Sequence, residues 1–155
     1  MNIPKQAVLA LAVQHLGVRS AANYLPVMQS SDADTKHMAI AVDVLLVGYP
    51  LLSLGTEHPR LFIFTPMQII IATLPTSNRQ VTAGSIDPLS IPAAEIMHFA
   101  VTLKHAIVTI SFDYQKQHFQ GTLDRYYGSD ERYVTDNLEH LASVGFYGRM
   151  APLTL

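Results

Sequence analysis

Cysteine and tryptophan are absent from this chain of 155 residues, and charged residues make up only 14% of it. Without cysteine, the chain cannot form disulfides, Cys-ligated zinc sites, iron–sulfur clusters or a thiol nucleophile. Ten Lys and Arg against twelve Asp and Glu leave a net charge of −2, which provides no strong field for nucleic acid or anionic lipid. The low charge and the 49% hydrophobic content predict one globular domain with an apolar interior, not a disordered chain.

Catalytic signatures are also missing. The sequence contains no G-x-S-x-G motif and neither of the common glycine-rich phosphate loops. Its seven histidines include no H-E-x-x-H or His-x-His pair, so we assign no metal ligand and predict no cofactor. His98, His105 and His118 could approach one another if their strands pair, but turn or surface positions are the simpler interpretation. Asp43 is a single acid in an apolar stretch, and such a residue is more often a hydrogen-bonded structural group than a catalyst. We therefore expect a protein that is not an enzyme.

The longest apolar stretch, Met38 to Leu54, is shorter than the roughly 20 residues that cross a bilayer, and it contains Asp43, Gly48 and Pro50. We interpret it as one long buried strand or two shorter ones. The N-terminus has too thin a basic region for a signal peptide. A cytoplasmic protein is the resulting expectation.

Alternation with a period of two predicts strands between residues 37 and 124. The clearest case is Ala106 to Tyr114, in which every second residue, beginning with Ala106, belongs to one apolar face. Shorter alternating segments at 99–103 and 119–124 flank it, which predicts a three-stranded antiparallel meander. Upstream, 61–64 and 68–72 are continuously apolar and predict a hairpin that is covered on both faces.

Pro75 to Pro88 is rich in Pro, Ser, Thr, Asn and Gly, and we expect it to form an exposed loop long enough to be functional. Within it, the predicted contact residues for a partner are Asn78, Arg79, Gln80 and Asp87.

Helical periodicity marks both ends of the chain. Near the C-terminus, Val134, Leu138, Leu141 and Ala142 form an apolar stripe that predicts a helix from Asp130 to Val144 packed on the sheet. Near the N-terminus, we expect a pair of helices, one ending at Gly17 and one running from Ser20 toward Pro26.

About seven antiparallel strands followed by one amphipathic helix resemble the pleckstrin-homology-like (PH-like) domains of bacteria. Residues 62–71 (FIFTPMQIII) resemble the second hairpin of that family, and residues 91–96 (IPAAEI) resemble the segment that leads into its last strands. The family usually has Asn or Asp and then Arg after the turn threonine, whereas Pro66, Met67 and Gln68 follow Thr65 here. The resemblance implies an α+β fold, a partly open antiparallel β-barrel capped by the C-terminal helix. It divides the chain into a helical segment 1–36, a barrel with its helix 37–146, and a tail 147–155.

The resemblance implies a noncatalytic scaffold that binds proteins, peptides or lipids. Of these we expect a protein or peptide, bound at a sheet edge or a loop. Two alternatives stay open. The N-terminal amphipathic helix could attach the protein to a membrane, although its polar face carries little positive charge. A small-ligand enzyme would need a sizeable cavity inside the barrel. Nucleic acid is not an expected partner, and the apolar N-terminal helices are compatible with homo-oligomerisation.

Overall fold

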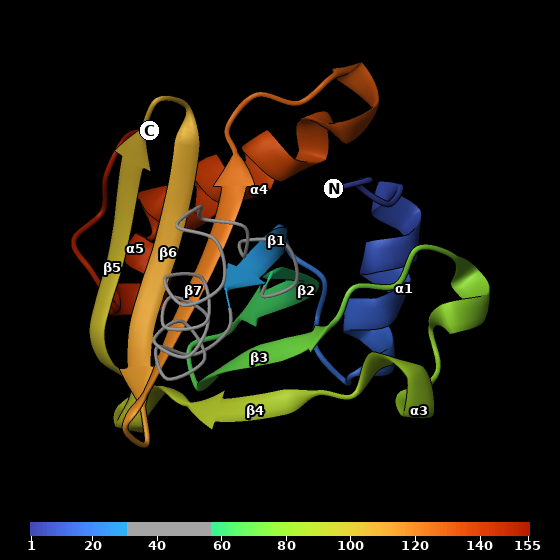
Figure 1. Ribbon diagram of the computed structural model, residues 1–155, viewed down its shortest axis with the longest axis horizontal. Coiled ribbons are helices and arrows are strands. Elements are labelled where there is room, and N and C mark those ends of the chain that lie inside the picture. The colour runs from blue at the N-terminus through green and yellow to red at the C-terminus, as the bar shows by residue number, and fades with distance from the viewer. Residues whose placement is uncertain (31–56) are drawn as a thin grey trace, which may run out of the picture.

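The computed structural model describes residues 1–30 and 57–155, whose strands form a seven-stranded antiparallel sheet (Figure 1). Across the sheet the strands follow the order β4-β3-β2-β1-β7-β6-β5, so the sheet is not closed and β4 and β5 are its edges. This arrangement, with a C-terminal helix, confirms the α+β class. The elements are α1 (Gln6–His15), β1 (Tyr24–Ser30), β2 (Glu57–Phe64), β3 (Gln68–Thr73), η1 (Asn78–Gln80), α3 (Ala83–Ile86), β4 (Leu89–Pro92), η2 (Ala93–Glu95), β5 (Met97–Lys104), β6 (Ile107–Tyr114), β7 (Gln117–Asp124), η3 (Ser129–Glu131), α4 (Arg132–Ser143) and α5 (Gly145–Gly148).

The predicted hairpin around Pro66 is formed by β2 and β3. The Thr65 hydroxyl closes its turn, accepting a hydrogen bond from the Gln68 N–H (3.0 Å) and donating one to the Gln68 carbonyl oxygen (3.1 Å). Residues 61–64 and 69–72 are all buried, which confirms that both faces of the hairpin are covered.

The predicted meander is formed by β5, β6 and β7. Val108, Ile110 and Phe112 are fully buried, whereas Ile107 on the opposite face is 41% exposed, as the alternation predicts. Both connecting turns have two residues with positive φ, at His105–Ala106 (50° and 67°) and Gln115–Lys116 (48° and 65°). Two such residues in a row form the turn whose twist matches a tight antiparallel hairpin.

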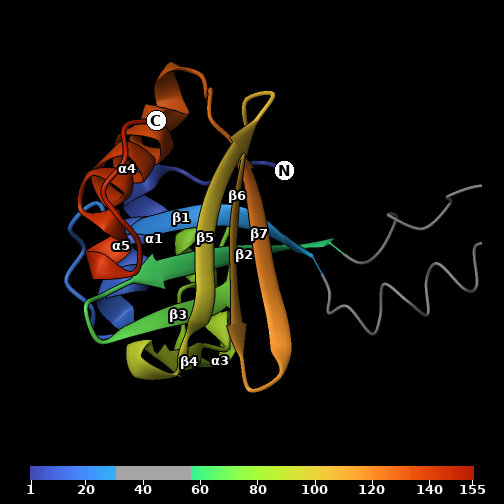
Figure 2. The same ribbon diagram turned by 90° about the vertical axis from the view of Figure 1, so that its left-hand side faces the viewer.

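The sheet consists of two halves, β1–β4 and β5–β7, whose strands run in clearly different directions (Figure 2). The halves are joined where β1 pairs with β7 over only three residues, Met28 to Ser30. At this junction a side chain on Gly121 would lie 2.9 Å from the Val27 Cγ2 and 3.0 Å from the Phe62 ring. A glycine is therefore needed for the close approach of the two halves.

The C-terminal helix α4 packs on the sheet through its predicted stripe, and Val134, Leu138, Leu141 and Ala142 are fully buried. The Asn137 amide on the same face donates a hydrogen bond of 2.9 Å to the Tyr24 carbonyl oxygen of β1. Since this polar group is satisfied, its burial carries little penalty.

The predicted N-terminal helical pair is wrong in its second half. α1 is a helix whose residues Leu9, Ala12 and Val13 are buried, but residues 24–30 form β1, a central strand of the sheet. The alanines of the short segment 20–26 favoured the prediction of a helix. Pairing with β2 on one side and β7 on the other outweighs this local helix propensity. Pro26 is tolerated because β7 pairs only with residues 28–30. The segment 1–36 therefore contains a strand of the sheet, and not helices alone.

The segment Pro75 to Pro88 is exposed at most positions, as predicted, but it contains the short helices η1 and α3. Buried Val81 and Ile86 anchor it to the core. The strand predicted at Met38 to Leu54, with Asp43, lies outside the described residues. Among the residues that the structure describes, no helix has both the length and the apolar character needed to cross a membrane.

Candidate functional site

The free edge of β5 is the longest unpaired edge of the described sheet. β5 has eight residues and pairs only with β6, whereas β4 at the other edge has four residues and ends in Pro92. Two large apolar side chains of β5 face solvent, with Met97 57% exposed and Leu103 42% exposed. An edge of this kind presents unpaired backbone N–H and C=O groups to which another strand can bind.

β5 begins with an irregularity between Met97 and Ala100, where its register to β6 shifts. His98 at this position has a φ of 53°, which is uncommon for a residue other than glycine. Bulges re-aim side chains and recur beside binding sites.

The His98 ring is held by the Asp113 carboxylate of β6. The His98 Nδ1 lies 2.7 Å from one Asp113 oxygen, and the His118 Nδ1 of β7 lies 2.7 Å from the other. These hydrogen bonds from His118 and His98 lower the pKa of the Asp113 carboxyl group and outweigh the effect of its desolvation. Three neighbouring strands are thus tied together at one end of the meander.

A groove of about 420 Å³ opens at the same end of β5. Its walls are small or apolar side chains, apart from His98, Tyr147 and Arg149. They come from the β2–β3 turn, from η2 and the start of β5, and from α5 and the residue that follows it: Pro66, Ala93, Ala94, Ile96, His98, Phe99, Tyr147, Gly148 and Arg149.

Arg149 is the charged group of this groove that lacks a counterion. Its guanidinium donates hydrogen bonds to the carbonyl oxygens of Thr65 (2.6 Å) and Phe146 (2.8 Å), while its buried Nε has no partner. Desolvation lowers the pKa of Arg149, although the nearby Tyr147 opposes the shift. The three salt bridges of the described residues do not include Arg149. A cation in this environment favours an anionic ligand.

The turn that carries Arg149 is left-handed. Gly145, Phe146, Tyr147 and Gly148 have φ values of 59°, 50°, 61° and 84°. For non-glycine residues this conformation costs roughly 1–2 kcal/mol each. Fully buried Phe146 holds the turn in place, with its ring centroid 5.1 Å from that of Phe64 and 5.4 Å from that of Phe99. Strain that the surroundings maintain in this way is characteristic of binding sites.

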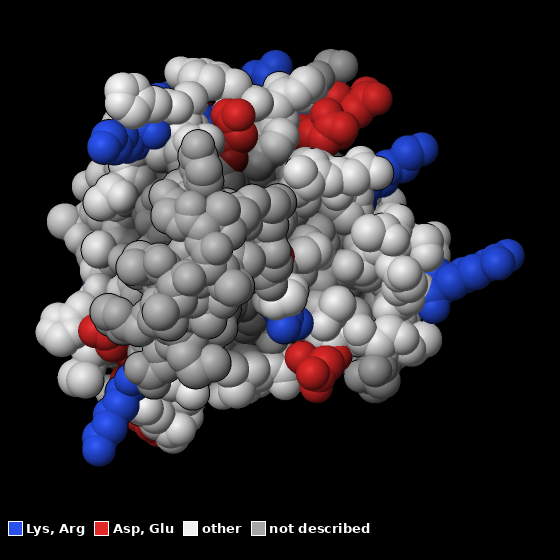
Figure 3. Space-filling view, viewed as in Figure 1, with Lys and Arg blue, Asp and Glu red and all other residues white. Residues whose placement is uncertain are grey.

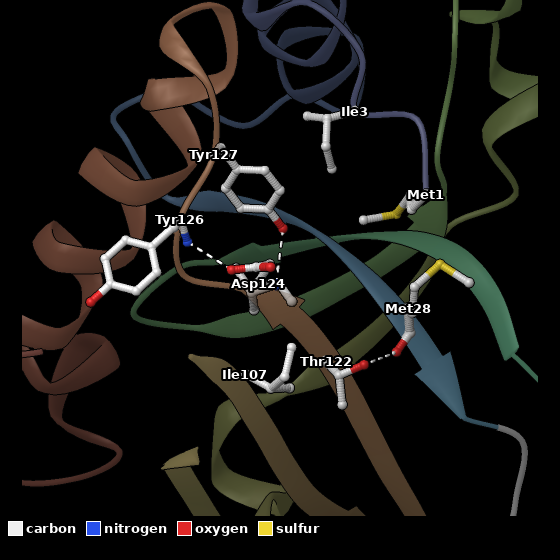
Figure 4. Close-up of a pocket in the computed structure, with 9 residues that line it drawn as sticks. Met1, Ile3, Met28, Ile107, Thr122, Asp124, Tyr126 and Tyr127 are labelled. Atoms are coloured by element: carbon white, nitrogen blue, oxygen red, sulfur yellow. Dashed lines mark hydrogen bonds between the residues drawn. The ribbon is translucent and has the colours of Figure 1, made fainter. Parts of the chain in front are cut away.

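A second pocket, of about 340 Å³, lies between the N-terminus and the C-terminal end of β7 (Figure 4). Tyr127 stands at its back, where its hydroxyl accepts a hydrogen bond of 3.1 Å from the Asp124 N–H, and burial raises its pKa to about 12. Tyr126 is instead 68% exposed, with the Arg125 guanidinium 5.5 Å from its ring centroid. Of these two tyrosines, Tyr127 packs against the core and Tyr126 does not.

The predicted contact residues do not gather at either pocket. Asn78, Arg79 and Gln80 form the exposed η1, and Asp87 follows α3 with a φ of 34°. The Gln80 side-chain oxygen accepts hydrogen bonds from the N–H (2.7 Å) and hydroxyl (2.9 Å) of Thr76. This segment lies on the opposite side of the molecule from β5 (Figure 1). Its role in binding stays a prediction.

The histidine prediction is met for only two of the three residues. Pairing of the meander brings His98 and His118 together through Asp113, but His105 lies in the turn at the other end of β5. Within the described ranges, no group of three His, Cys, Asp or Glu side chains is placed to hold a metal ion.

Sequence reasoning missed Arg149, which it assigned to the tail 147–155. The only local signal was its position after two closely spaced glycines, Gly145 and Gly148. No family model and no curated protein matches this chain.

Proposed function

We propose that this protein is a noncatalytic binding module of PH-like architecture that recognises an extended peptide segment of a protein partner. The free eight-residue edge of β5 is the observation that carries the proposal. Strand addition at such an edge obtains its affinity from backbone hydrogen bonds and its specificity from side chains at alternate positions. The strand order and the helix that follows support the PH-like part of the proposal. A cytoplasmic location belongs to the same proposal.

The charge distribution favours this class of partner over nucleic acid or an anionic membrane. On the face shown in Figure 3, the Lys and Arg side chains are scattered, mostly around the margin, and Asp and Glu side chains lie among them. The membrane alternative would also require α1 to release its buried apolar face, which includes Leu9 and Val13. Liposome sedimentation tests that alternative.

The edge can be blocked selectively at Leu103. The two-residue turn makes Lys104 and Ile107 the hydrogen-bonded pair that closes the hairpin, so the Leu103 N–H points away from β6. Leu103→Pro removes this outward donor and retains the ladder, whereas Leu103→Ala is a matched control that retains the donor. We expect L103P to weaken peptide binding by about tenfold or more, because one backbone bond is lost and the ring obstructs the next strand.

The test uses a library of randomised octapeptides, the length of β5, on the immobilised full chain. Retained peptides are then titrated into the labelled protein and followed by amide NMR shifts. The proposal expects shifts along β5 that L103A preserves and that, with L103P, require about tenfold or more peptide. Retention of no peptide, or shifts confined to residues 75–88, would overturn it.

A further inference from the structure

We infer that the groove at the start of β5 binds the C-terminal carboxylate of the peptide that adds to this strand, with Arg149 as the anchoring cation. This inference rests on the proposed function and names the chemistry of the partner's end.

Strand direction leads to this assignment. All strand pairs of the sheet are antiparallel, so a strand added in the same pattern runs opposite to β5. β5 runs from Met97, beside the groove, to Lys104. The C-terminus of an antiparallel peptide therefore reaches the groove, whereas its N-terminus lies near Lys104.

Arg149 supplies the charge that a terminal carboxylate needs. The guanidinium has five N–H donors, of which one on each terminal nitrogen is used for the carbonyl oxygens of Phe146 and Thr65. Its partly buried position excludes much of the competing water, which strengthens an ion pair with a ligand. Both carbonyl contacts also fix the planar group in one orientation, so little further ordering is needed when a ligand binds.

The remaining walls suit a terminal residue with an apolar side chain. Ala93, Ala94 and Gly148 leave space, and Ile96 and Phe99 provide apolar contact surface. His98 stands at the rim, its Nδ1 directed to Asp113 and its other ring nitrogen free of that bond.

The experiment compares the octapeptide library in two forms, with free C-terminal carboxylates and with amidated ends. We expect free-acid peptides to bind wild-type protein about tenfold or more tightly than their amides, as one charge-assisted contact provides. The Arg149 Nε–H resonance should shift only with the free acids. In Arg149→Gln the preference should disappear, while Arg149→Lys should retain part of it and Arg132→Gln, on the outer face of α4, should retain all of it.

Because Arg149→Gln also loses two structural hydrogen bonds, the free-acid and amide comparison on the unaltered protein is the decisive measurement. Equal binding of both forms along β5 would overturn this inference and leave the proposed function standing. A third outcome is that amidated peptides bind as tightly as free acids, but only when they contain Asp or Glu. This result would overturn the inference, because the groove would then bind a side-chain carboxylate and not the C-terminal one. Failure of both forms to bind would overturn the proposed function as well.

Discussion

Asp113 shows how a single residue can order a strand end. Its two oxygens bind one histidine from β5 and one from β7, while Asp113 itself belongs to β6. The cluster lies at the register shift of β5, where backbone pairing is incomplete. Side-chain hydrogen bonds therefore replace part of the ladder at the place where the groove begins.

The lowered pKa of Asp113 predicts that the free energy of unfolding depends on pH in the acid range. A carboxyl group with a lower pKa in the folded state stabilises the fold above its ordinary value of 3.8, and that contribution is lost as the pH falls through the folded value. Asp113→Asn should remove this component, so the free energy of unfolding of the variant should fall less between about pH 5 and pH 2. The difference should stay below about 1 kcal/mol, since solvent screens this exposed cluster.

Urea denaturation of wild type and Asp113→Asn across that range measures the effect. Asp136→Asn, which removes a carboxylate from the outer face of α4, is the matched control. Parallel pH profiles for wild type and Asp113→Asn would contradict the assignment.

At the scale of elements, the meander depends on two tight turns built from residues other than glycine. His105 and Ala106 form one turn, and Gln115 and Lys116 form the other, all with positive φ. Side chains at these positions crowd the backbone, which glycine avoids. The turns are therefore formed at a cost that the long pairing of β6 with both neighbours offsets.

Ala106→Gly should consequently stabilise the protein by about 0.5–1 kcal/mol, since relief of the left-handed strain exceeds the extra entropy of the unfolded chain. Thermal unfolding of the variant should show a higher midpoint than wild type. Ala100→Gly, in the body of β5, is the control that should destabilise. A lower midpoint for Ala106→Gly would show that the turn is not strained.

At the scale of the molecule, the fold depends on how the two halves of the sheet meet. β1 pairs with β2 over all seven of its residues but with β7 over only three. Aromatic side chains pack across this junction, since the ring centroids of Phe62 in β2 and Phe112 in β6 are 6.3 Å apart. The relative position of the halves determines where β5 and the α5 turn meet, and so determines the groove.

Gly121→Ala should destabilise the protein by about 1–3 kcal/mol, because its new methyl group would press on Val27 and Phe62 at the junction. Chemical denaturation measures the loss. Val27→Ala combined with Gly121→Ala should cost less than the sum of the two single changes, as the contact with Val27 is then relieved. Full additivity would contradict a clash at this position.

Short-range patterns in the chain were sufficient to predict the meander, the β2–β3 hairpin and α4. Each depends on a period of two or of three to four residues that is visible within one element, as in residues 106–114 and 134–142. Burial then followed, because one face of each element is apolar.

The position of β1 and the candidate site depended instead on contacts between distant residues. Residues 24–30 are too few for a reliable period, and they become a strand because β2 and β7 bond to them from both sides. His98 and Asp113 meet through the pairing of their strands, and Arg149 reaches Thr65 across 84 positions of sequence. Local periodicity contains no information about which distant backbone closes around a segment, so these features emerge only when the chain is folded.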